Sequence, residues 1–378
     1  MAARKRTAAA GGGPAGGDGK QVLEKMRESA GEVLRAIEKG KPPDFSFPVR
    51  ALANVSYDPK VGYFEIGKDE TARSLNYNTV KPFAQTMRMM GMSKALVRTR
   101  DFATKRDAYY MSKNWEDARF DEQDESDTVM DDLEAHFRVN REQLGFVPDE
   151  HGGQVAGELV VIDRDRETGR PIEIDCTRFG SGSYAVPSTV EQLEFRTSAK
   201  FVLAIETGGV FQRLAAHNYW KQAKCILVSM GGVPTRACRR FIRRLSEVRR
   251  IPVYAFVDCD PYGISNIYRT LKVGSGNAAH INRFFCVPHA KYLGVTPQDI
   301  KDYDLPTHPL KDVDIKRAND ALKNDPFFRH YAPWQEAIKM LLAMGVRAEQ
   351  QAFSKHTLSY VMDTYLPRKM KDPGKFLP

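Results

Sequence analysis

Two aspartates, Asp258 and Asp260, directly follow a short run with the composition of a buried strand. Residues 253–257 are mostly β-branched or aromatic, and Pro261 and Gly263 then turn the chain. In α/β sheets, chemistry is placed at the carboxyl ends of the strands. Carboxylates held this close suit Mg²⁺, which takes a few carboxylates plus substrate phosphates. The segment predicts a metal-assisted phosphoryl-transfer site, although alone it is more typical of a polar exit from a strand.

A third carboxylate, Glu206, directly follows an apolar run at 201–205. A glycine pair comes next, and then a segment whose apolar residues recur at helical spacing. Between these two runs lies another apolar run, 225–229, followed by a very basic helix from Thr235. Alternating strands and helices predict a parallel, doubly wound sheet. We expect residues 284–287 to form its fourth strand.

A tyrosine pair upstream could supply a nucleophile. Thr104 and Asp107 have the spacing of a helix capping box, which places Tyr109 and Tyr110 in the first turns of a helix. The electropositive start of that helix, which carries Arg106, favours a phosphate. Tyrosine is a poor nucleophile at its ordinary pKa of about 10, so attack on a phosphodiester needs cations that Arg106 and Mg²⁺ can supply. A tyrosine pair taken alone is more often a packing element.

The order and context of Glu206, Asp258, Asp260 and Gly263 resemble the Toprim domain of topoisomerases, primases and some nucleases. Arg-Asp-x-Tyr-Tyr at 106–110, ahead of that domain, resembles the A subunits of DNA topoisomerase VI and their meiotic relatives, the transesterases that make double-strand breaks. The resemblance extends from about Thr79 to the end of the chain. It is closest to the archaeal topoisomerase subunits in segments 109–115, 120–123, 231–236, 304–310 and 348–352.

The resemblance implies an α+β and α/β multidomain chain, with a winged-helix (CAP-like) domain followed by a Toprim domain built on a Rossmann-like parallel sheet. It makes Tyr110 the nucleophile with Arg106 beside it, and Glu206, Asp258 and Asp260 the Mg²⁺ ligands. Glu206 is also a candidate general acid or base. Such proteins cut double-stranded DNA through transient 5′-phosphotyrosyl bonds, as homodimers of A subunits that join an ATPase B subunit in an A₂B₂ heterotetramer.

The expected organisation has four parts: a disordered basic tail at 1–20, residues 21–76 as an arm that docks on the B subunit, the winged-helix domain with the catalytic tyrosine at 77–148, and the Toprim metal-binding domain at 149–378. Further expected elements are helices at 21–39, from Val80 and from a Ser126 cap to about His136, and a hairpin joining 157–162 to 171–175.

Composition agrees with this interpretation. A length of 378 residues allows two domains, and a hydrophobic content of 42% suffices for real cores. No apolar run approaches the roughly 18 residues of a membrane span, so no membrane partner is expected. The net charge of +9 suits a polyanion, with basic clusters at 98–113 and 236–250. Five cysteines without CxxC spacing indicate reduced core residues. His308 is a weaker candidate, more typical of a structural residue.

Three functions remain open from the sequence. The first is the DNA-cleaving subunit of an ATP-dependent type II topoisomerase; because no P-loop is present, a partner would have to bind the ATP. The second is a meiotic break-forming transesterase, which the archaeal motifs disfavour. The third is a Toprim nuclease or DNA-binding relative with a structural Tyr110. We expect the protein in the cytoplasm with the nucleoid if prokaryotic, and in the nucleus if eukaryotic.

Overall fold

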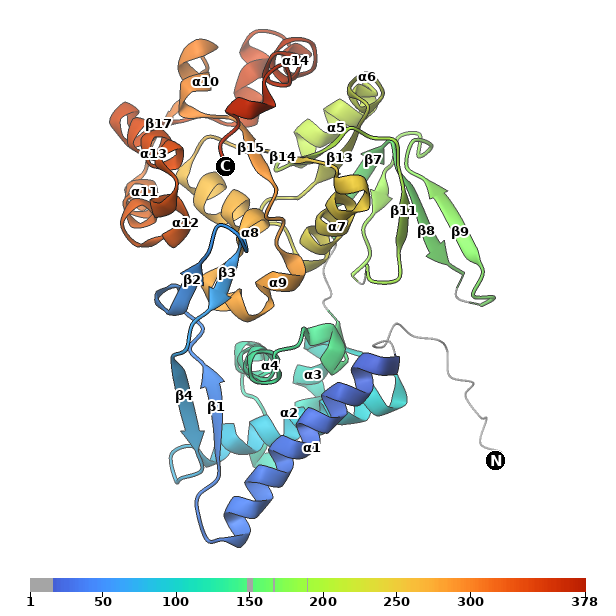
Figure 1. The fold of residues 1–378 in the computed structure, drawn as a ribbon, viewed down its shortest axis with the longest axis vertical. Coiled ribbons are helices and arrows are strands. Elements are labelled where there is room, and N and C mark those ends of the chain that lie inside the picture. Colours follow the sequence, from blue (N-terminus) through green and yellow to red (C-terminus); the bar gives the residue numbers. More distant parts are fainter. Residues whose placement is uncertain (1–15, 148–151, 166, 189) are drawn as a thin grey trace. The chain divides into compact units, whose positions relative to one another are not determined.

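The computed structural model describes residues 16–147, 152–165, 167–188 and 190–378. The chain forms two compact units (Figure 1). Unit 1 draws its described residues from Met1–Asn54, Ile66–Asp149 and Arg166–Gly169, and unit 2 draws its own from Val55–Glu65, Glu150–Asp165 and Arg170–Pro378. Of the tail expected at 1–20, residues 1–15 lie outside the described part of the chain.

Unit 1 is built mainly from helices packed on one apolar core. The helices are α1 (Gly16–Glu38), α2 (Val80–Thr99), α3 (Lys105–Ser112) and α4 (Gln123–Phe137). Met89, Met90 and Met92 of α2 lie in the core with Leu133 of α4, so these methionines serve packing. The first helix begins at Gly16, before the expected start at Gln21.

The start of α4 differs from the prediction. The residue that precedes it is Glu122, and Ser126 lies inside the first turns, where its hydroxyl donates to the carbonyl oxygen of Gln123 at 2.8 Å. A serine can bond backward to its own helix as well as cap one, so its identity did not fix the boundary. Asp124 and Glu125 in the first turn favour the observed start through the helix dipole.

Short strands and turns complete unit 1. Strand β1 (Asp44–Pro48) pairs antiparallel with β4 (Glu70–Ser74), and β5 (Ala103–Thr104) pairs parallel with β6 (Phe146–Val147). Phe45 and Phe47 alternate into a small core, as the two-residue period of a strand requires. The remaining elements are the 3₁₀ turns η1 (Leu52–Asn54), η2 (Glu116–Ala118) and η3 (Arg141–Leu144).

Unit 2 contains a six-stranded sheet in the order β10-β7-β13-β12-β14-β15. Its strands are β7 (Gln154–Gly157), β10 (Tyr184–Ala185), β12 (Phe201–Ile205), β13 (Cys225–Ser229), β14 (Val253–Phe256) and β15 (Lys291–Gly294). The last four are mutually parallel, and β7 runs antiparallel to β13. Every residue of β12, β13 and β14 is buried, because helices cover both faces of a parallel sheet.

Two crossovers set the architecture of this sheet (Figure 1). Helix α5 (Gly208–Ala216), followed by α6 (Tyr219–Ala223), joins β12 to β13, and α7 (Arg236–Glu247) joins β13 to β14 on the other side of β12. The two connections run in opposite directions, so right-handed crossovers place α5 and α7 on opposite faces. The four parallel strands and their crossovers agree with the predicted doubly wound sheet, but β7 runs antiparallel, so the sheet is mixed and not wholly parallel.

The fourth parallel strand is not where the sequence placed it. The composition of residues 284–287 predicts a strand. In the structure, residues 284 and 285 instead end the short helix α9 (Asn282–Phe285), and the strand beside β14 is β15. Phe285, Cys286 and Val287 are buried. A short apolar run signals burial without separating strand from helix, and this run is buried as a helix end and loop.

The basic helix α7 uses much of its charge inside unit 2. Arg240 Nε lies 2.7 Å from Glu191, Arg243 donates to the carbonyl oxygen of Cys286 at 3.0 Å, and Arg244 donates to that of Leu193 at 2.6 Å. These arginines anchor neighbouring loops to the helix. A basic cluster in the sequence is therefore a poor measure of the charge that this segment offers to a polyanion.

The predicted hairpin is confirmed as β8 (Val160–Arg164) paired antiparallel with β9 (Pro171–Asp175), and β11 (Glu194–Arg196) pairs with the other edge of β8. The other elements of unit 2 are β2 (Val55–Tyr57), β3 (Phe64–Ile66), η4 (Val248–Arg250), η5 (Gly263–Tyr268), α8 (Arg269–Lys272), η6 (Gly276–Ile281), α10 (Pro297–Asp302), β16 (His308–Pro309), α11 (Asp312–Asn324), α12 (Pro326–His330), α13 (Ala332–Met344), β17 (Val346–Arg347), η7 (Gln350–Lys355), η8 (Val361–Tyr365), α14 (Leu366–Lys369) and η9 (Pro373–Lys375).

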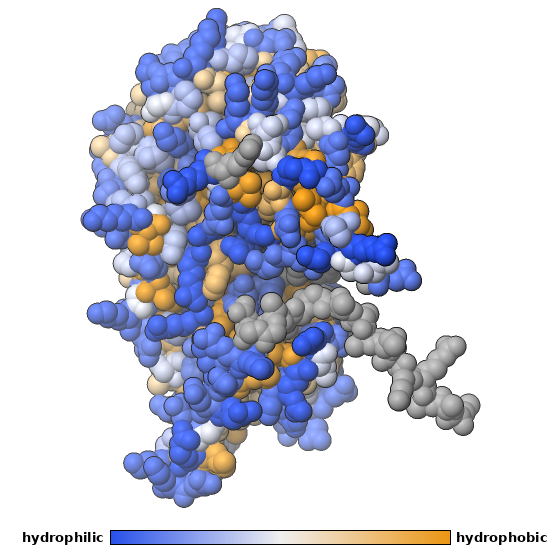
Figure 2. Space-filling view, turned by 45° about the vertical axis from the view of Figure 1, so that its right-hand side comes forward, coloured by the Kyte–Doolittle hydropathy of each residue, from blue (hydrophilic) through white to orange (hydrophobic). Residues whose placement is uncertain are grey.

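The surface agrees with the composition. The face seen in Figure 2 is mostly hydrophilic, and its hydrophobic side chains gather in separate patches. Within the described residues, no helix is long and apolar enough to cross a membrane. The five cysteines are free and buried, in agreement with reduced core residues.

Candidate functional site

The topology of the unit 2 sheet brings three acids together. Glu206 directly follows β12, and Asp258 and Asp260 follow β14, which pairs in parallel with β12. The chain leaves β12 toward β13 on one side and later returns to β14 on the other side. The carboxyl ends of β12 and β14 therefore flank the switch point, where open α/β sheets bind ligands.

Backbone N–H groups hold one oxygen of each carboxylate. The amide of Asp258 donates to Glu206 Oε2 at 2.9 Å, and the amide of Gly263 donates to Asp260 Oδ1 at 2.6 Å. Asp258 Oδ1 accepts from the backbone of Gln350 at 2.8 Å. The main chain thus fixes one oxygen of each acid.

Gln350 is a residue of this site to which the sequence gave no role. Its side chain is completely buried, donates to the carbonyl oxygen of Phe256 at 2.5 Å and accepts from the amide of Thr207 at 3.3 Å. It therefore ties the end of β12 to the end of β14. Its position in the motif at 348–352 was the only signal in the sequence, since contacts across this distance along the chain leave no local pattern.

Burial and mutual repulsion dominate the electrostatics of the acids. Desolvation, with the charge of Asp258 second, raises the pKa of Glu206 to about 8. Desolvation also raises the pKa of Asp258 to about 6, against the hydrogen bond from Gln350. The pKa of Asp260 is raised by burial as well. Because like charges repel strongly in a partly desolvated site, a bound cation would stabilise all three ionised forms.

The donor set fits the expected Mg²⁺. All three candidate ligands are carboxylates, the hard oxygen donors that this ion prefers. Cys259 between the aspartates is fully buried, and burial raises the pKa of its thiol, so it remains a neutral core residue. Among the described residues, no group of three or more His, Cys, Asp or Glu side chains lies close enough together to hold a metal ion. The acids fit an open site, in which waters and substrate oxygens complete the Mg²⁺ shell.

The tyrosine helix of unit 1 has the predicted cap. Thr104 Oγ1 accepts from the amide of Asp107 at 3.1 Å, and Asp107 Oδ2 accepts from the amide of Thr104 at 2.9 Å. Tyr110 on this helix is 56% exposed. Arg106 Nη2 lies 3.5 Å from Tyr110 Oη, one helical turn away. The helix thus presents an accessible phenol oxygen beside a cation.

The two tyrosines differ in what their hydroxyl groups do. Tyr109 donates to the carbonyl oxygen of Asp121 at 2.9 Å, and Lys113 Nζ lies 4.1 Å from its ring centre. Its ring also packs against the core of unit 1. The Tyr109 hydroxyl is therefore engaged in structure, whereas that of Tyr110 faces solvent.

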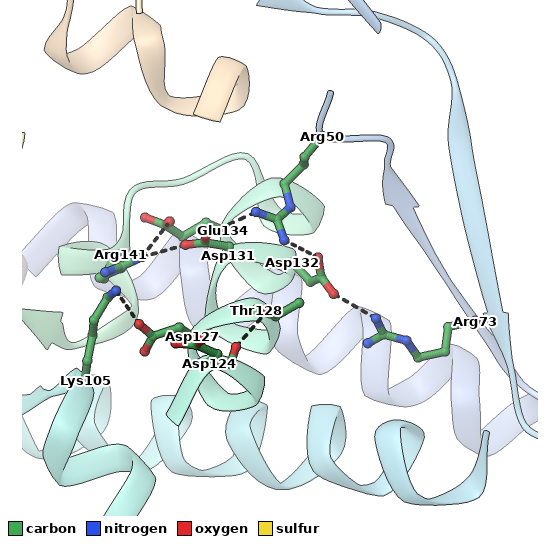
Figure 3. Close-up of polar contacts among 10 residues, drawn as sticks. All are labelled: Arg50, Arg73, Lys105, Asp124, Asp127, Thr128, Asp131, Asp132, Glu134 and Arg141. Carbon is green, nitrogen blue, oxygen red and sulfur yellow. Dashed lines mark hydrogen bonds and ion pairs between the residues drawn. The ribbon is translucent and has the colours of Figure 1, made fainter. Parts of the chain in front are cut away.

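A series of ion pairs along α4 attaches neighbouring segments to that helix, and one of these pairs reaches the tyrosine helix (Figure 3). At one end, Lys105 Nζ lies 2.5 Å from Asp127 Oδ2, which attaches the first turn of α3 to α4. At the other end, Asp132 binds Arg50 at 3.0 Å and Arg73 at 2.8 Å. The Lys105–Asp127 pair fixes the first turn of α3 on α4, and the pairs of Asp132 attach the segments that carry Arg50 and Arg73 to the same helix.

The structure therefore groups the predicted residues in two sets. Tyr110 and Arg106 are neighbours in unit 1, and Glu206, Asp258 and Asp260 are neighbours in unit 2. His308 lies in β16, exposed and paired with β17.

Replacing Glu206 by Gln should stabilise the metal-free protein at alkaline pH. The group ionises near pH 4.5 when unfolded, whereas the folded pKa is about 8. Folding therefore loses stability as the pH rises above 4.5, and the loss is complete above about pH 8. A glutamine still accepts the Asp258 N–H without the charge, so we expect a gain of roughly 1–3 kcal/mol at alkaline pH. Urea denaturation with a chelator at about pH 5 and about pH 9 measures the free energy of unfolding of the parent and the variant. Equal gains at both pH values would contradict the prediction.

Gly263→Ala should destabilise the protein, because an added Cβ would lie 2.8 Å from the carbonyl oxygen of Asp258 and 2.9 Å from Val257 Cγ1. Overpacking of this kind costs roughly 1–3 kcal/mol. The matched control is Gly209→Ala in α5, where a Cβ meets nothing within 4 Å and the change should be neutral or stabilising. Thermal denaturation of the two variants checks the prediction, which fails if both behave alike.

Comparison with known families agrees with this geometry. Residues 201–370 match the family model of the Toprim domain of the topoisomerase 6 A subunit and Spo11. Residues 149–199 match "All-beta domain in DNA topoisomerase VI alpha subunit", and residues 81–146 match "Type IIB DNA topoisomerase". The acids fall in the first of these ranges and Tyr110 in the last.

Individual relatives extend the similarity over nearly the whole chain. The A subunit of type 2 DNA topoisomerase 6 from Methanocaldococcus jannaschii is 51% identical over 355 residues, which cover 94% of this chain and 96% of the relative. The same subunits of Methanothermobacter thermautotrophicus and Pyrococcus abyssi are 38% and 35% identical, over 93% and 96% of this chain and 97% and 96% of the relatives. The chain belongs to the family of type 2 DNA topoisomerase 6 A subunits.

Proposed function

We propose that this chain is the DNA-cleaving A subunit of a type IIB DNA topoisomerase. The observation that carries the proposal is that this chain contains both parts of such a site. It has an exposed tyrosine beside an arginine, and it has three carboxylates at the switch point of a Toprim sheet. Tyrosine and acids are the parts that reversible transesterification of a phosphodiester needs.

The proposed reaction exchanges one ester for another. Tyr110 Oη attacks the phosphorus, the bond from phosphorus to the 3′ oxygen breaks, and the tyrosine becomes linked to the 5′ phosphate. The phenol proton passes to a base and the leaving 3′ oxygen takes up a proton, so the step needs no other reactant. Arg106 stabilises negative charge on the phenol oxygen and the phosphate. The reverse attack by the 3′ oxygen reseals the strand.

Glu206, Asp258 and Asp260 are the proposed Mg²⁺ ligands. The bound ion supplies positive charge to the phosphate oxygens and orients them. Glu206 is also the proposed general acid or base toward the 3′ oxygen, a role in which its carboxylate would exchange a proton with that oxygen. Asp258 and Asp260 keep their backbone hydrogen bonds and hold the ligand geometry.

The proposal includes the assembly that the family implies. Residues 77–148 would act as a winged-helix domain that places Tyr110 on double-stranded DNA, 149–378 as the metal-binding part, and 21–76 as the docking arm. Two A subunits would pair, and an ATPase B subunit would supply ATP hydrolysis in an A₂B₂ complex. The protein would work wherever chromosomal DNA lies, in the nucleoid or the nucleus.

Tyr110→Phe should abolish covalent attachment to DNA while leaving DNA affinity nearly unchanged, since only the attacking oxygen is lost. Tyr109→Phe is the matched control and should retain activity, because its hydroxyl serves a structural hydrogen bond. Peptide mapping of cleavage complexes trapped with a B subunit gives the answer. Adduct on Tyr109, or adduct in Tyr110→Phe, would refute the assignment, and Mg²⁺-dependent cleavage that never reseals would indicate a break-forming transesterase.

Mixed dimers test whether each site uses residues of both protomers. If Tyr110 of one protomer works with the acids of the other, mixing Tyr110→Phe and Glu206→Ala chains creates one intact site per heterodimer. Single-strand nicking should then return, although each parent homodimer is inactive. If each chain uses its own residues, every site keeps one defect. Nicking is scored on supercoiled plasmid, with differently tagged chains to prove exchange; exchange without nicking rejects the shared site.

A further inference from the structure

Arg347 lies beside the acid cluster on a segment that the proposed reaction does not yet use. It ends β17, which pairs antiparallel with β16. The next residue, Ala348, forms an antiparallel bridge with Cys259, with N–O distances of 2.8 and 3.1 Å. The main chain on either side of Arg347 is therefore fixed next to the loop that carries Asp258 and Asp260.

The guanidinium of Arg347 approaches two carboxylates without bonding to either. Its Nη1 atom lies 4.0 Å from Asp260 Oδ2 and 3.9 Å from Asp314 Oδ2. Both distances exceed the 2.7–3.2 Å range of an N–H···O hydrogen bond. Its Nε is buried without a partner, and the side chain is 26% exposed. Within the described part of the chain, Arg347 makes ion pairs only at the outer limit of contact.

Two arginines of unit 2 approach their carboxylates more closely than Arg347 does, although Nε of Arg269 is also buried without a partner. Arg240 binds Glu191 at 2.7 Å, and Arg269 binds Asp325 at 2.8 Å. A guanidinium whose task was to neutralise Asp260 or Asp314 would close to a similar distance, because the attraction rises as the charges approach. The five donors of a largely buried guanidinium are normally satisfied. Arg347 is thus held near the acids with its donors left for an anion.

We propose that Arg347 is a phosphate-binding residue that donates to an oxygen of the reacting phosphodiester beside Asp260. This inference rests on the proposed function of the acid cluster. A planar guanidinium matches the geometry of a phosphate, and its position next to a metal ligand lets one phosphate contact both the arginine and the metal site. In the transition state the added negative charge on the phosphate oxygens strengthens the contact.

The test compares Arg347→Gln and Arg347→Lys with the matched control Arg317→Gln. Arg317 also faces Asp314, at 3.6 Å, and is 29% exposed, but it stacks over the ring of Tyr262 and has no contact with Asp260. The rate of covalent adduct formation is measured with the B subunit over a range of Mg²⁺ concentrations. At saturating Mg²⁺ we expect Arg347→Gln to lose a factor on the order of 10²–10³, Arg347→Lys to recover part of it, and the control to match the parent.

The Mg²⁺ dependence separates phosphate binding from mere positioning of Asp260. Loss of a cation beside a metal ligand should leave the half-saturating Mg²⁺ concentration unchanged or lower it. If raised Mg²⁺ restores the rate of Arg347→Gln, or if that variant cleaves at the parent rate, the inference is wrong. Circular dichroism confirms folding, and Arg347→Lys decides the question if Arg347→Gln does not fold.

A second measurement keeps this inference distinct from the proposed function. Binding of inorganic phosphate in the presence of Mg²⁺, followed by phosphorus NMR, does not require cleavage. If the affinity for phosphate falls by a factor of about 10 in Arg347→Gln but not in Arg317→Gln, the inference is supported even if the parent forms no adduct. If the parent forms no adduct, only the proposed function is rejected. Equal phosphate binding by the parent and both variants overturns the role of Arg347.

Discussion

Repulsion between carboxylates at a partly desolvated sheet edge is the constraint that organises unit 2. The order of the parallel strands forces Glu206 and the Asp258–Asp260 pair into proximity, and burial raises the pKa of each. Backbone N–H groups, among them that of Gln350, hold these acids without neutralising them. An arrangement that costs stability when empty and charged is best explained by a cationic ligand, since a purely structural role would favour neutral side chains.

Unit 1 handles charge in the opposite way. Along α4, most acids that lie close to a basic side chain form a short pair, as Asp127 does with Lys105 and Asp132 with Arg50 (Figure 3). The Lys105–Asp127 pair positions the helix that carries Tyr110, and both pairs satisfy the charges involved. Arg106 is left beside the phenol oxygen at 3.5 Å. The contrast between satisfied and unsatisfied charges therefore marks the reactive end of this helix more clearly than the number of basic residues does.

The sequence predicted the features that depend on neighbours along the chain. The strands at 201–205 and 225–229, the capping box of Thr104 and Asp107 and the β8–β9 hairpin are local patterns, and all were confirmed. The strand expected at 284–287 was wrong because apolarity reports burial and not backbone conformation. Gln350 and Arg347 could not be given roles, because their meaning arises from contacts across about 90 residues of chain. The catalytic roles of Tyr110 and the three acids stay predictions until tested chemically.

The number of basic residues in a segment is a poor measure of the charge that it offers to an anion. In α7, the densest basic segment, Arg240, Arg243 and Arg244 donate to Glu191 or to backbone carbonyl oxygens, with donor–acceptor distances of 3.1 Å or less. Arg347 stands in no basic cluster, yet it retains unsatisfied donors beside the acids. An arginine that already donates internal hydrogen bonds must break them to bind DNA. Arg347, which lies about 4 Å from its neighbouring carboxylates, can donate to a phosphate without breaking such bonds. For this fold, the distances around each arginine are therefore the better guide to where an anion binds.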